Sequence, residues 1–279
     1  MEPNTPLKRG FYNFSIFKAK CYMSTEKKAN ILLILILTSL FSCTNDNNGD
    51  VLPSIISIDV EDKTKWILFK NYEFDQSDKK ELFQEWIPQN SATTHTLCSR
   101  WEENVEVNNG TVKLVAKKES RGGQDWTAAS IWTKEDFQYG YFECKYKYAA
   151  ASGTNNSFWL FSLDRSEFEI DINEGHYPNK LNTNIHYWNV LYPMYFSYKE
   201  ANFSQGYNLF GLEWNESELI YYINRGEIRR IKNTGCFSPA KIYLSLAIFE
   251  WAGAVTDAID GKYMEIEYVR VYKPVTSED

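Results

Sequence analysis

The chain has 279 residues, a formal net charge of −7 at pH 7, and a composition that is 43% hydrophobic and 16% aromatic. A surplus of acids disfavours a nucleic-acid partner, because phosphate backbones are bound mainly through lysine and arginine. Three histidines and five cysteines show no zinc-type spacing, so we predict no metal centre of that kind.

The first part of the chain is predicted to be an export signal. Lys27 and Lys28 precede an apolar run, residues 31–41, that is too short to span a bilayer. Residues 1–42 are therefore expected to be a signal peptide. The basic stretch before Met23 is explained most simply by a mis-assigned start codon.

The end of this signal resembles a bacterial lipobox, reading Leu-Phe-Ser-Cys with the cysteine at position 43. The resemblance implies that Cys43 carries the lipid that anchors the protein to the cell envelope, at the outer membrane or cell surface. Residues 43–60 are expected to form a flexible polar tether. Removal of residues 1–42, which carry a net charge of +4, changes the formal charge from −7 to −11.

Residues 61–276 are predicted to be one all-β domain. Short strands separated by turn residues dominate this part, and a long helical periodicity is missing. One clear hairpin has its first strand at residues 219–224, its turn at 225–227 and its second strand from Ile228. The pattern indicates an antiparallel sandwich, and about 230 residues fit one such domain.

The acidic segment EFEIDINE, which ends at Glu174, alternates carboxylates with large apolar residues. In a strand this spacing places Glu169, Asp171 and Asn173 on one face. Glu174 has the wrong parity to join them, unless an extra residue near Ile172 and Asn173 is absorbed as a β-bulge. We predict this bulge, which brings Glu169, Asp171 and Glu174 to one face.

Two glutamates on one face of a sheet have the geometry required to cleave a glycosidic bond. Carboxyl groups about 5–5.5 Å apart indicate retaining chemistry, in which one carboxylate attacks and a protonated one donates to the leaving oxygen. Their mutual repulsion separates the two pKa values. The alternative is a solvated acidic strand face, but apolar strands are expected on both sides, at residues 157–162 and 184–188.

The motif EIDINE resembles the bulged signature Glu-x-Asp-x-x-Glu of family 16 glycoside hydrolases. Four further segments resemble strands of that family in the family's order: residues 109–117, 137–145, 210–214 and 264–272. The resemblance covers roughly residues 66–274 and implies a concanavalin A-like β-jelly roll of two curved antiparallel sheets with a concave substrate cleft.

The resemblance also implies roles for individual residues. Glu169 corresponds to the nucleophile, Glu174 to the acid/base and Asp171 to the supporting carboxylate. Glu143 and Lys145 are placed on the cleft floor as substrate hydrogen-bonders. The family more often has arginine where Lys145 stands, and a lysine lacks the planar bidentate fork of arginine.

Aromatic side chains are the expected sugar contacts, because flat C–H faces of sugars stack on indole rings. We expect Trp132, Trp188 and Trp251 to contact substrate, and Trp159 to lie in the core. His186 is predicted to hydrogen-bond substrate or Asp171, with a structural histidine as the equal alternative.

The resulting prediction is an endo-acting, retaining β-glycosidase that cleaves a polysaccharide by double displacement. The alternatives are a transglycosylase on the same scaffold and a catalytically inactive surface glycan-binding protein. Laminarin-degrading relatives usually read Trp-Pro-Ala-Phe-Trp where this chain reads Asn155-Asn-Ser-Phe-Trp159. The substrate is therefore left open between a β-1,3/1,4-linked glucan and a galactan, and the acidity of the chain favours a neutral glycan.

No cofactor is expected to be required, and a structural calcium is left open without assigned residues. Once residues 1–43 are set aside, Cys98, Cys144 and Cys236 allow at most one disulfide. Cys144 is predicted to be a buried thiol. The protein is expected to be a monomer.

Overall fold

The structure is a computed structural model, and it describes residues 56–108, 110–162, 168–187, 194–199 and 202–276. These residues belong to one compact unit, Val51–Asp279. The signal segment 1–42, the lipidation site Cys43 and Trp188 lie outside the described residues. No helix within the described ranges is long and apolar enough to cross a membrane.

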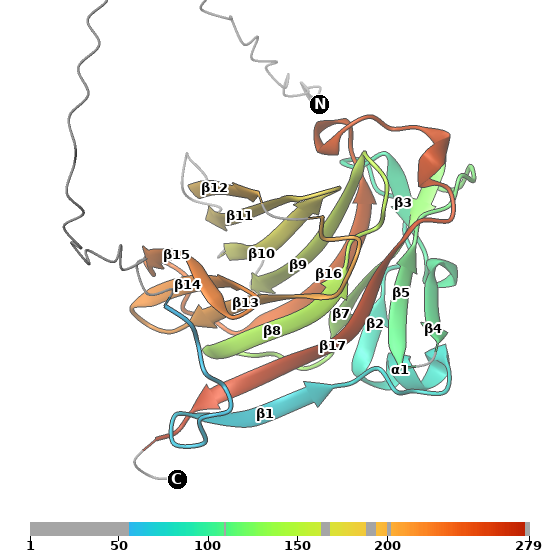
Figure 1. The fold of residues 1–279 in the computed structure, drawn as a ribbon. Helices are drawn as coiled ribbons and strands as arrows, with labels where there is room; N and C mark the ends of the chain where they lie inside the picture. Colours follow the sequence, from blue (N-terminus) through green and yellow to red (C-terminus); the bar gives the residue numbers. More distant parts are fainter. Residues whose placement is uncertain (1–55, 109, 163–167, 188–193, 200–201, 277–279) are drawn as a thin grey trace, which may run out of the picture. The chain divides into compact units, whose positions relative to one another are not determined.

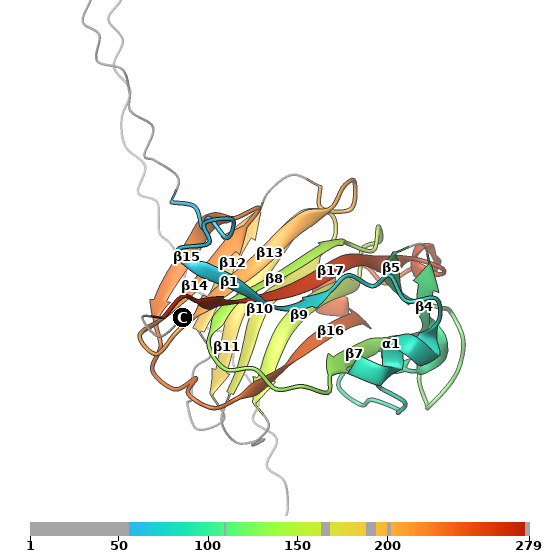
Figure 2. The same cartoon turned by 90° about the horizontal axis from the view of Figure 1, so that it is seen from below.

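Two antiparallel sheets form the unit (Figures 1 and 2). The first sheet has the order β15-β14-β13-β8-β17-β5-β4, with β1 beside β17. Its strands are β1 (Trp66–Tyr72), β4 (Val105–Asn108), β5 (Thr111–Val115), β8 (Gly140–Lys147), β13 (Asn208–Trp214), β14 (Glu218–Ile223), β15 (Gly226–Lys232) and β17 (Tyr263–Pro274).

The second sheet has the order β12-β11-β10-β9-β16-β7-β2. Its strands are β2 (Trp86–Pro88), β7 (Ser130–Thr133), β9 (Thr154–Ser162), β10 (Phe168–His176), β11 (Lys180–Tyr187), β12 (Met194–Lys199) and β16 (Ala240–Ile248). The order follows the jelly-roll topology predicted from the sequence.

Three smaller kinds of element were not predicted. A parallel pair joins β3 (Cys98–Arg100) to β6 (Trp126–Ala128). Helix α1 (Lys79–Glu85) begins after Asp78, whose side chain accepts a hydrogen bond from the Glu81 backbone N–H and so caps the helix. Three short 3₁₀ turns are η1 (Glu102–Asn104), η2 (Glu250–Ala252) and η3 (Asp257–Ile259).

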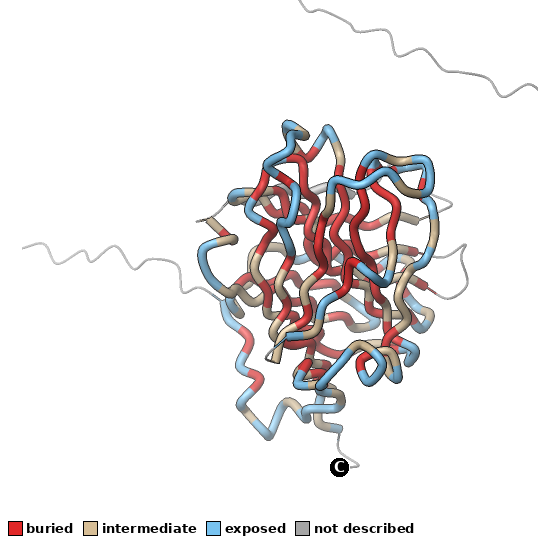
Figure 3. Tube along the Cα trace, turned by 90° about the vertical axis from the view of Figure 1, so that its right-hand side faces the viewer, coloured by how far each residue is buried: buried red, intermediate tan, exposed pale blue. Residues whose placement is uncertain are grey.

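The main core lies between the two sheets, and the central strands are buried over most of their length (Figure 3). Phe142 and Tyr146 of β8 face this core, as do Phe168 and Ile170 of β10. An edge-to-face contact joins the sheets directly, because the rings of Phe168 and Trp214 lie 5.6 Å apart at 75°. Burying each such aromatic side chain stabilises the fold by roughly 1.5–3 kcal/mol.

The predicted hairpin is confirmed, with a tighter turn than expected. Strands β14 and β15 pair antiparallel, and Gly226 is already the first residue of β15. The turn residues are Asn224 and Arg225, with φ values of 49° and 68°. Positive φ at both positions is typical of the type I′ turn, whose twist matches that of a two-residue hairpin.

The last residues of the expected tether, 57–60, contact the domain, so the predicted flexible segment 43–60 extended too far. Ile58 and Val60 are buried against Tyr141 and Tyr272, on the face of the first sheet that points away from the main core. The Ile58 N–H donates to the Arg225 carbonyl at 3.0 Å. Two apolar side chains in the polar tether region provide the burial that fixes this segment.

The three cysteines of the described region are free and buried. The expectation of a buried thiol at Cys144 is confirmed. No disulfide forms among Cys98, Cys144 and Cys236.

Candidate active site

Strand β10 contains the predicted bulge. Asp171 pairs with Trp159 of β9, whereas Glu174 pairs with Ser157, so three steps along β10 match two along β9. The register with β11 shifts between the same two acids. The extra residue gives Glu174 the same face as Glu169 and Asp171, as a bulge beside an active site often does.

Simple alternation predicted Asn173 on the same face as the acids, and this prediction was wrong. It is fully buried on the core side of β10, where its Nδ2 donates to the hydroxyls of Tyr146 and Tyr148. The bulge turns this amide inward. The side chain therefore supports the acid face from behind rather than lining it.

The three acids line one cavity of about 400 Å³ on the outer face of the second sheet. Both glutamates are partly exposed, and Asp171 is buried. The other residues lining the cavity are His95, Arg100, Asn155, Ser157, Trp159, Ser245 and Phe249.

Burial raises the pKa of all three carboxyls, and the charge of a neighbouring acid adds to this at Glu169 and Asp171. Burial is the largest cause for Glu169, whose pKa rises to about 8, with the charge of Asp171 next. Burial and the charge of Glu174 raise the pKa of Asp171. Burial also raises the pKa of Glu174, against a hydrogen bond from Asn155 that lowers it. The cluster therefore retains protons at neutral pH, and these are shared among the three groups.

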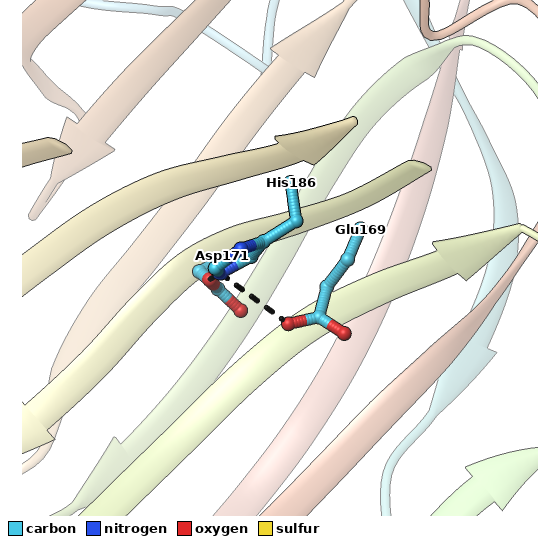
Figure 4. Close-up of side chains that lie close together, drawn as sticks. All are labelled: Glu169, Asp171 and His186. Atoms are coloured by element: carbon cyan, nitrogen blue, oxygen red, sulfur yellow. Dashed lines mark ion pairs between the residues drawn. The ribbon is translucent and has the colours of Figure 1, made fainter. Parts of the chain in front are cut away.

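His186 lies over Asp171 and Glu169, as Figure 4 shows. Its Nε2 is 3.2 Å from Asp171 Oδ2 and 3.7 Å from Glu169 Oε1. The same nitrogen is 3.0 Å from Nδ2 of Asn184, whose oxygen accepts from the Ile185 N–H. Nε2 accepts from Asn184 in the tautomer that carries its proton on Nδ1, and in that tautomer Asp171 Oδ2 has no hydrogen-bond donor among the described residues.

Glu169, Asp171 and His186 each place one potential ligand atom within 4.8 Å of the others. Within the described ranges, no other group of histidines, cysteines and acids has metal-type spacing. Because carboxylate chemistry requires the same atoms, we assign no metal to them. The calcium expectation stays without assigned residues.

Trp159 faces the cavity, which contradicts its expected place in the core. Its neighbours Phe158 and Leu160 take the core positions of β9, so strand alternation turns Trp159 outward. The indole stacks on Tyr243 with centroids 4.2 Å apart, and its Nε1 donates to Ser245 Oγ at 3.1 Å.

Trp132, one of the predicted sugar contacts, extends this aromatic surface. It pairs with Tyr243 across β7 and β16, and the two rings stack with centroids 5.4 Å apart. Trp132, Tyr243 and Trp159 therefore form a continuous row across three strands, which we call the aromatic row. Such a row offers apolar surface for contact with sugars.

Trp251, another predicted sugar contact, is 55% exposed in the loop after β16. Its ring stacks on Phe249, which lines the cavity, at 4.4 Å, and makes a tilted contact with His176 at 4.9 Å. These two contacts hold the exposed ring beside the cavity. Trp188 lies outside the described residues, so its predicted role stays a prediction.

The placement of Glu143 and Lys145 on the cleft floor was wrong. Both belong to β8 in the first sheet, with parity opposite to the core residues Phe142 and Cys144. Glu143 is fully buried, and accepts hydrogen bonds from Arg225 Nε at 3.0 Å and from two tyrosines. Lys145 pairs with Glu267 at 2.9 Å. Glu143 therefore holds the first sheet together, and neither residue lines the cavity.

Sequence reasoning missed several residues that line the cavity. Asn155 Nδ2 donates to Glu174 Oε1 at 3.1 Å, so the position that departs from the Trp-Pro pattern contacts one of the acids. Its parity in β9, two residues before Ser157, was a usable signal. Arg100 ends the three-residue strand β3 and His95 lies in the loop before it, and neither is preceded by a periodic sequence signal.

The described part of the chain is thus a two-sheet jelly roll with paired glutamates and a row of aromatics on one outer face. The model of glycosyl hydrolases family 16 matches residues 92–270, which is more than half of the chain. The chain belongs to this family.

Two curated relatives illustrate the similarity. The endo-1,3-1,4-β-glycanase ExsH of Rhizobium meliloti is 29% identical over 181 residues, which cover 60% of this chain and 39% of the relative. A β-glucanase of Acetivibrio thermocellus is 27% identical over 186 residues, covering 63% and 54%. The chain thus matches only about two fifths to one half of the length of these relatives.

Solved structures share the fold. SCLam, a non-specific endo-β-1,3(4)-glucanase of the same family, superposes with a TM-score of 0.68 at 25% identity, covering 75% of this chain and 92% of that one. The endo-β-1,3-glucanase of Pyrococcus furiosus gives a TM-score of 0.70 at 21% identity, covering 81% and 100%.

Proposed function

We propose that this protein is an endo-acting, retaining β-glycosidase that hydrolyses a β-linked glucan. The observation that carries the proposal is the bulge in β10, which sets Glu169 and Glu174 on one face of one cavity. The names of the relatives, which are glucanases and a 1,3-1,4-β-glycanase, favour a glucan over a galactan.

The roles of the two glutamates follow from the resemblance of their motif to the family signature, and the attack requires the ionised form of Glu169. Glu169 attacks the anomeric carbon as a carboxylate and forms a glycosyl ester. Glu174 first protonates the leaving oxygen, and then takes a proton from the water that hydrolyses the ester. Its raised pKa keeps the proton available for the first step. The neighbouring carboxyl of Asp171 tunes this proton distribution through its charge.

The contacts of the cavity support a hydrolase more than a simple binding protein. Asp171 is buried beside two partly exposed glutamates, and this arrangement of acids costs stability unless it serves chemistry. A transglycosylase would use the same groups. The ratio of transfer products to new reducing ends, measured with added oligosaccharide, separates these two activities.

The test is cleavage of laminarin and mixed-linkage glucan, with agarose, porphyran and carrageenan as the alternative substrates. We expect new reducing ends from a glucan, and a loss of at least about 10³-fold in Glu169→Gln and in Glu174→Gln. Both variants should fold and bind glycan normally. Undiminished cleavage by Glu169→Gln would contradict the proposal.

We also propose that the enzyme acts at the cell envelope, exported by residues 1–42 and anchored by a lipid on Cys43. The supporting observation is the order of segments in the signal: two lysines, then an apolar run, then a small residue before Cys43 in the lipobox-like sequence. Cys43→Ser should release the protein from membranes during cell fractionation. Retention of that variant in the membrane fraction would argue against the anchor.

A further inference from the structure

Arg100 is a buried cation in the wall of the cavity that holds the acids. Its side chain lines this cavity together with Glu169, yet the residue is only 8% exposed. The backbone is fixed on two sides, because Arg100 pairs with Ser91 through two hydrogen bonds and with Ala128 of β6. The guanidinium therefore projects from a rigid part of the fold.

This guanidinium lacks the partners that a buried charge normally has. Its Nη1 donates to Gln89 Oε1 at 3.3 Å, and Nε has no partner among the described residues. The Cys98 side chain is a further polar neighbour, and the charge of Glu169 also acts on the guanidinium. No carboxylate of the described residues forms an ion pair with it. Burying an unpaired charge costs several kcal/mol, so an unused donor facing a cavity indicates a ligand that supplies the counter-charge.

Arg225 shows how the same fold treats a structural arginine. Its Nε donates to the fully buried carboxylate of Glu143 at 3.0 Å, and its other nitrogens lie near Glu61 and Glu143. Arg225 is thus neutralised within the protein, although it is more exposed than Arg100. The contrast indicates that Arg100 is not placed for internal pairing.

Arg100 lies near the charge of Glu169 without forming an ion pair with it, so its unpartnered Nε stays available to a ligand. His95 also lines the cavity, and burial together with the charge of Arg100 lowers the pKa of this histidine. His95 is therefore neutral at pH 7. A planar guanidinium matches the two oxygens of a carboxylate or sulfate, whereas a neutral sugar hydroxyl supplies no counter-charge.

We propose that Arg100 binds an anionic substituent, a carboxylate or a sulfate ester, on the sugar that occupies the cavity beside Glu169. This inference rests on the proposed glycosidase function and adds the substrate class, a glucan that carries acidic groups. The net negative charge of the chain acts at long range and affects the encounter rate, while Arg100 acts in direct contact with the sugar.

Three versions of one polymer provide the test: laminarin, laminarin oxidised to carry carboxylates, and laminarin carrying sulfate esters. We expect the wild-type protein to prefer one of the two anionic polymers in kcat/KM. The preferred polymer identifies carboxylate or sulfate as the ligand. Added NaCl should reduce kcat/KM on that polymer and leave the neutral one nearly unaffected.

Arg100→Gln should reduce the ratio of anionic to neutral kcat/KM roughly 100-fold, and Arg100→Lys should reduce it less, because lysine keeps the charge and loses the fork. Arg230→Gln is the matched control, since Arg230 is exposed on β15 and pairs with Glu218 and Glu227. It should leave the ratio unchanged.

A wild-type protein that prefers neutral laminarin, or an Arg100→Gln variant that loses both activities equally, would overturn the inference. The preference in kcat/KM and its salt dependence are measured on the wild type. These two results therefore test the inference even if Arg100→Gln unfolds. If the wild type cleaves none of the polymers, the proposed function fails. Calorimetric binding of the three polymers to wild type and Arg100→Lys then still tests the role of Arg100.

Discussion

Asn173 Nδ2 donates to the Tyr148 hydroxyl at 2.8 Å, on the side of β10 opposite Glu174. This inward hydrogen bond is made by the residue at which the register of β10 shifts. Because the amide is held between the sheets, the extra residue is absorbed there and Glu174 takes the face of Glu169. The geometry of the acids thus depends on a residue that does not line the cavity.

Asn173→Ala should therefore reduce activity as well as stability. Loss of the amide leaves the hydroxyls of Tyr146 and Tyr148 without their donor, and costs about 1–3 kcal/mol in the free energy of unfolding. Asn104→Ala is the control, because Asn104 is another buried amide that bonds Val115 and Thr127, outside the cavity lining. Both variants should lose stability, but kcat of the folded protein should fall only in Asn173→Ala. Equal kcat values in the two folded variants would contradict a role in positioning Glu174.

Glu143→Ala should destabilise the protein without reducing the activity of the folded fraction. The substitution leaves Arg225 without its carboxylate, and removing one partner of such a buried pair costs about 3 kcal/mol or more. Urea unfolding and kcat/KM on the same sample measure the two effects. A stably folded variant that has lost cleavage would restore Glu143 to the substrate site.

The stability of the protein should fall as the pH rises from about 4.5 to about 8. Glu169 has a folded-state pKa of about 8 against an ordinary 4.5, so between these values the folded state holds a proton that the unfolded chain has lost. Each unit of pKa shift corresponds to about 1.4 kcal/mol. Glu169→Gln cannot ionise and should flatten this slope in unfolding measured at pH 5 and pH 8. An unchanged slope would exclude Glu169 as its source.

Asn155→Ala should shift the alkaline limb of the kcat/KM profile to higher pH. The Asn155 amide donates to Glu174 and lowers the pKa of that carboxyl, so its loss favours the protonated form. The measured pKa belongs to the cluster of Glu169, Asp171 and Glu174 rather than to one residue. A shift to lower pH, with an unchanged melting temperature, would contradict this assignment.

The sequence was sufficient to predict the sandwich and the bulge because both follow from parity. Alternating side chains give the faces of β9 and β10, and the misplaced Glu174 identified the extra residue. The same rule was applied too loosely at Trp159. Its apolar neighbours suggested a core strand, but Phe158 and Leu160 alone fill the core positions.

Parity does not show which sheet a strand joins. Glu143 and Lys145 share one face of β8, as predicted, but β8 belongs to the first sheet, and the cavity lies on the second. Long-range pairing decides this, and the short motif around Glu143 does not record it. Arg100 was missed for a similar reason. Its position depends on pairing with Ser91 and Ala128, and no sequence pattern near Arg100 indicates either partner.

The most direct test of the central claim is the anomeric configuration of the first product, followed by proton NMR during glucan hydrolysis. If Glu169 forms a glycosyl ester that Glu174 helps to hydrolyse, two displacements occur and the β-anomer appears first. We predict that it converts to α only at the rate of mutarotation. Initial release of the α-anomer would show a single displacement and contradict the roles assigned to Glu169 and Glu174.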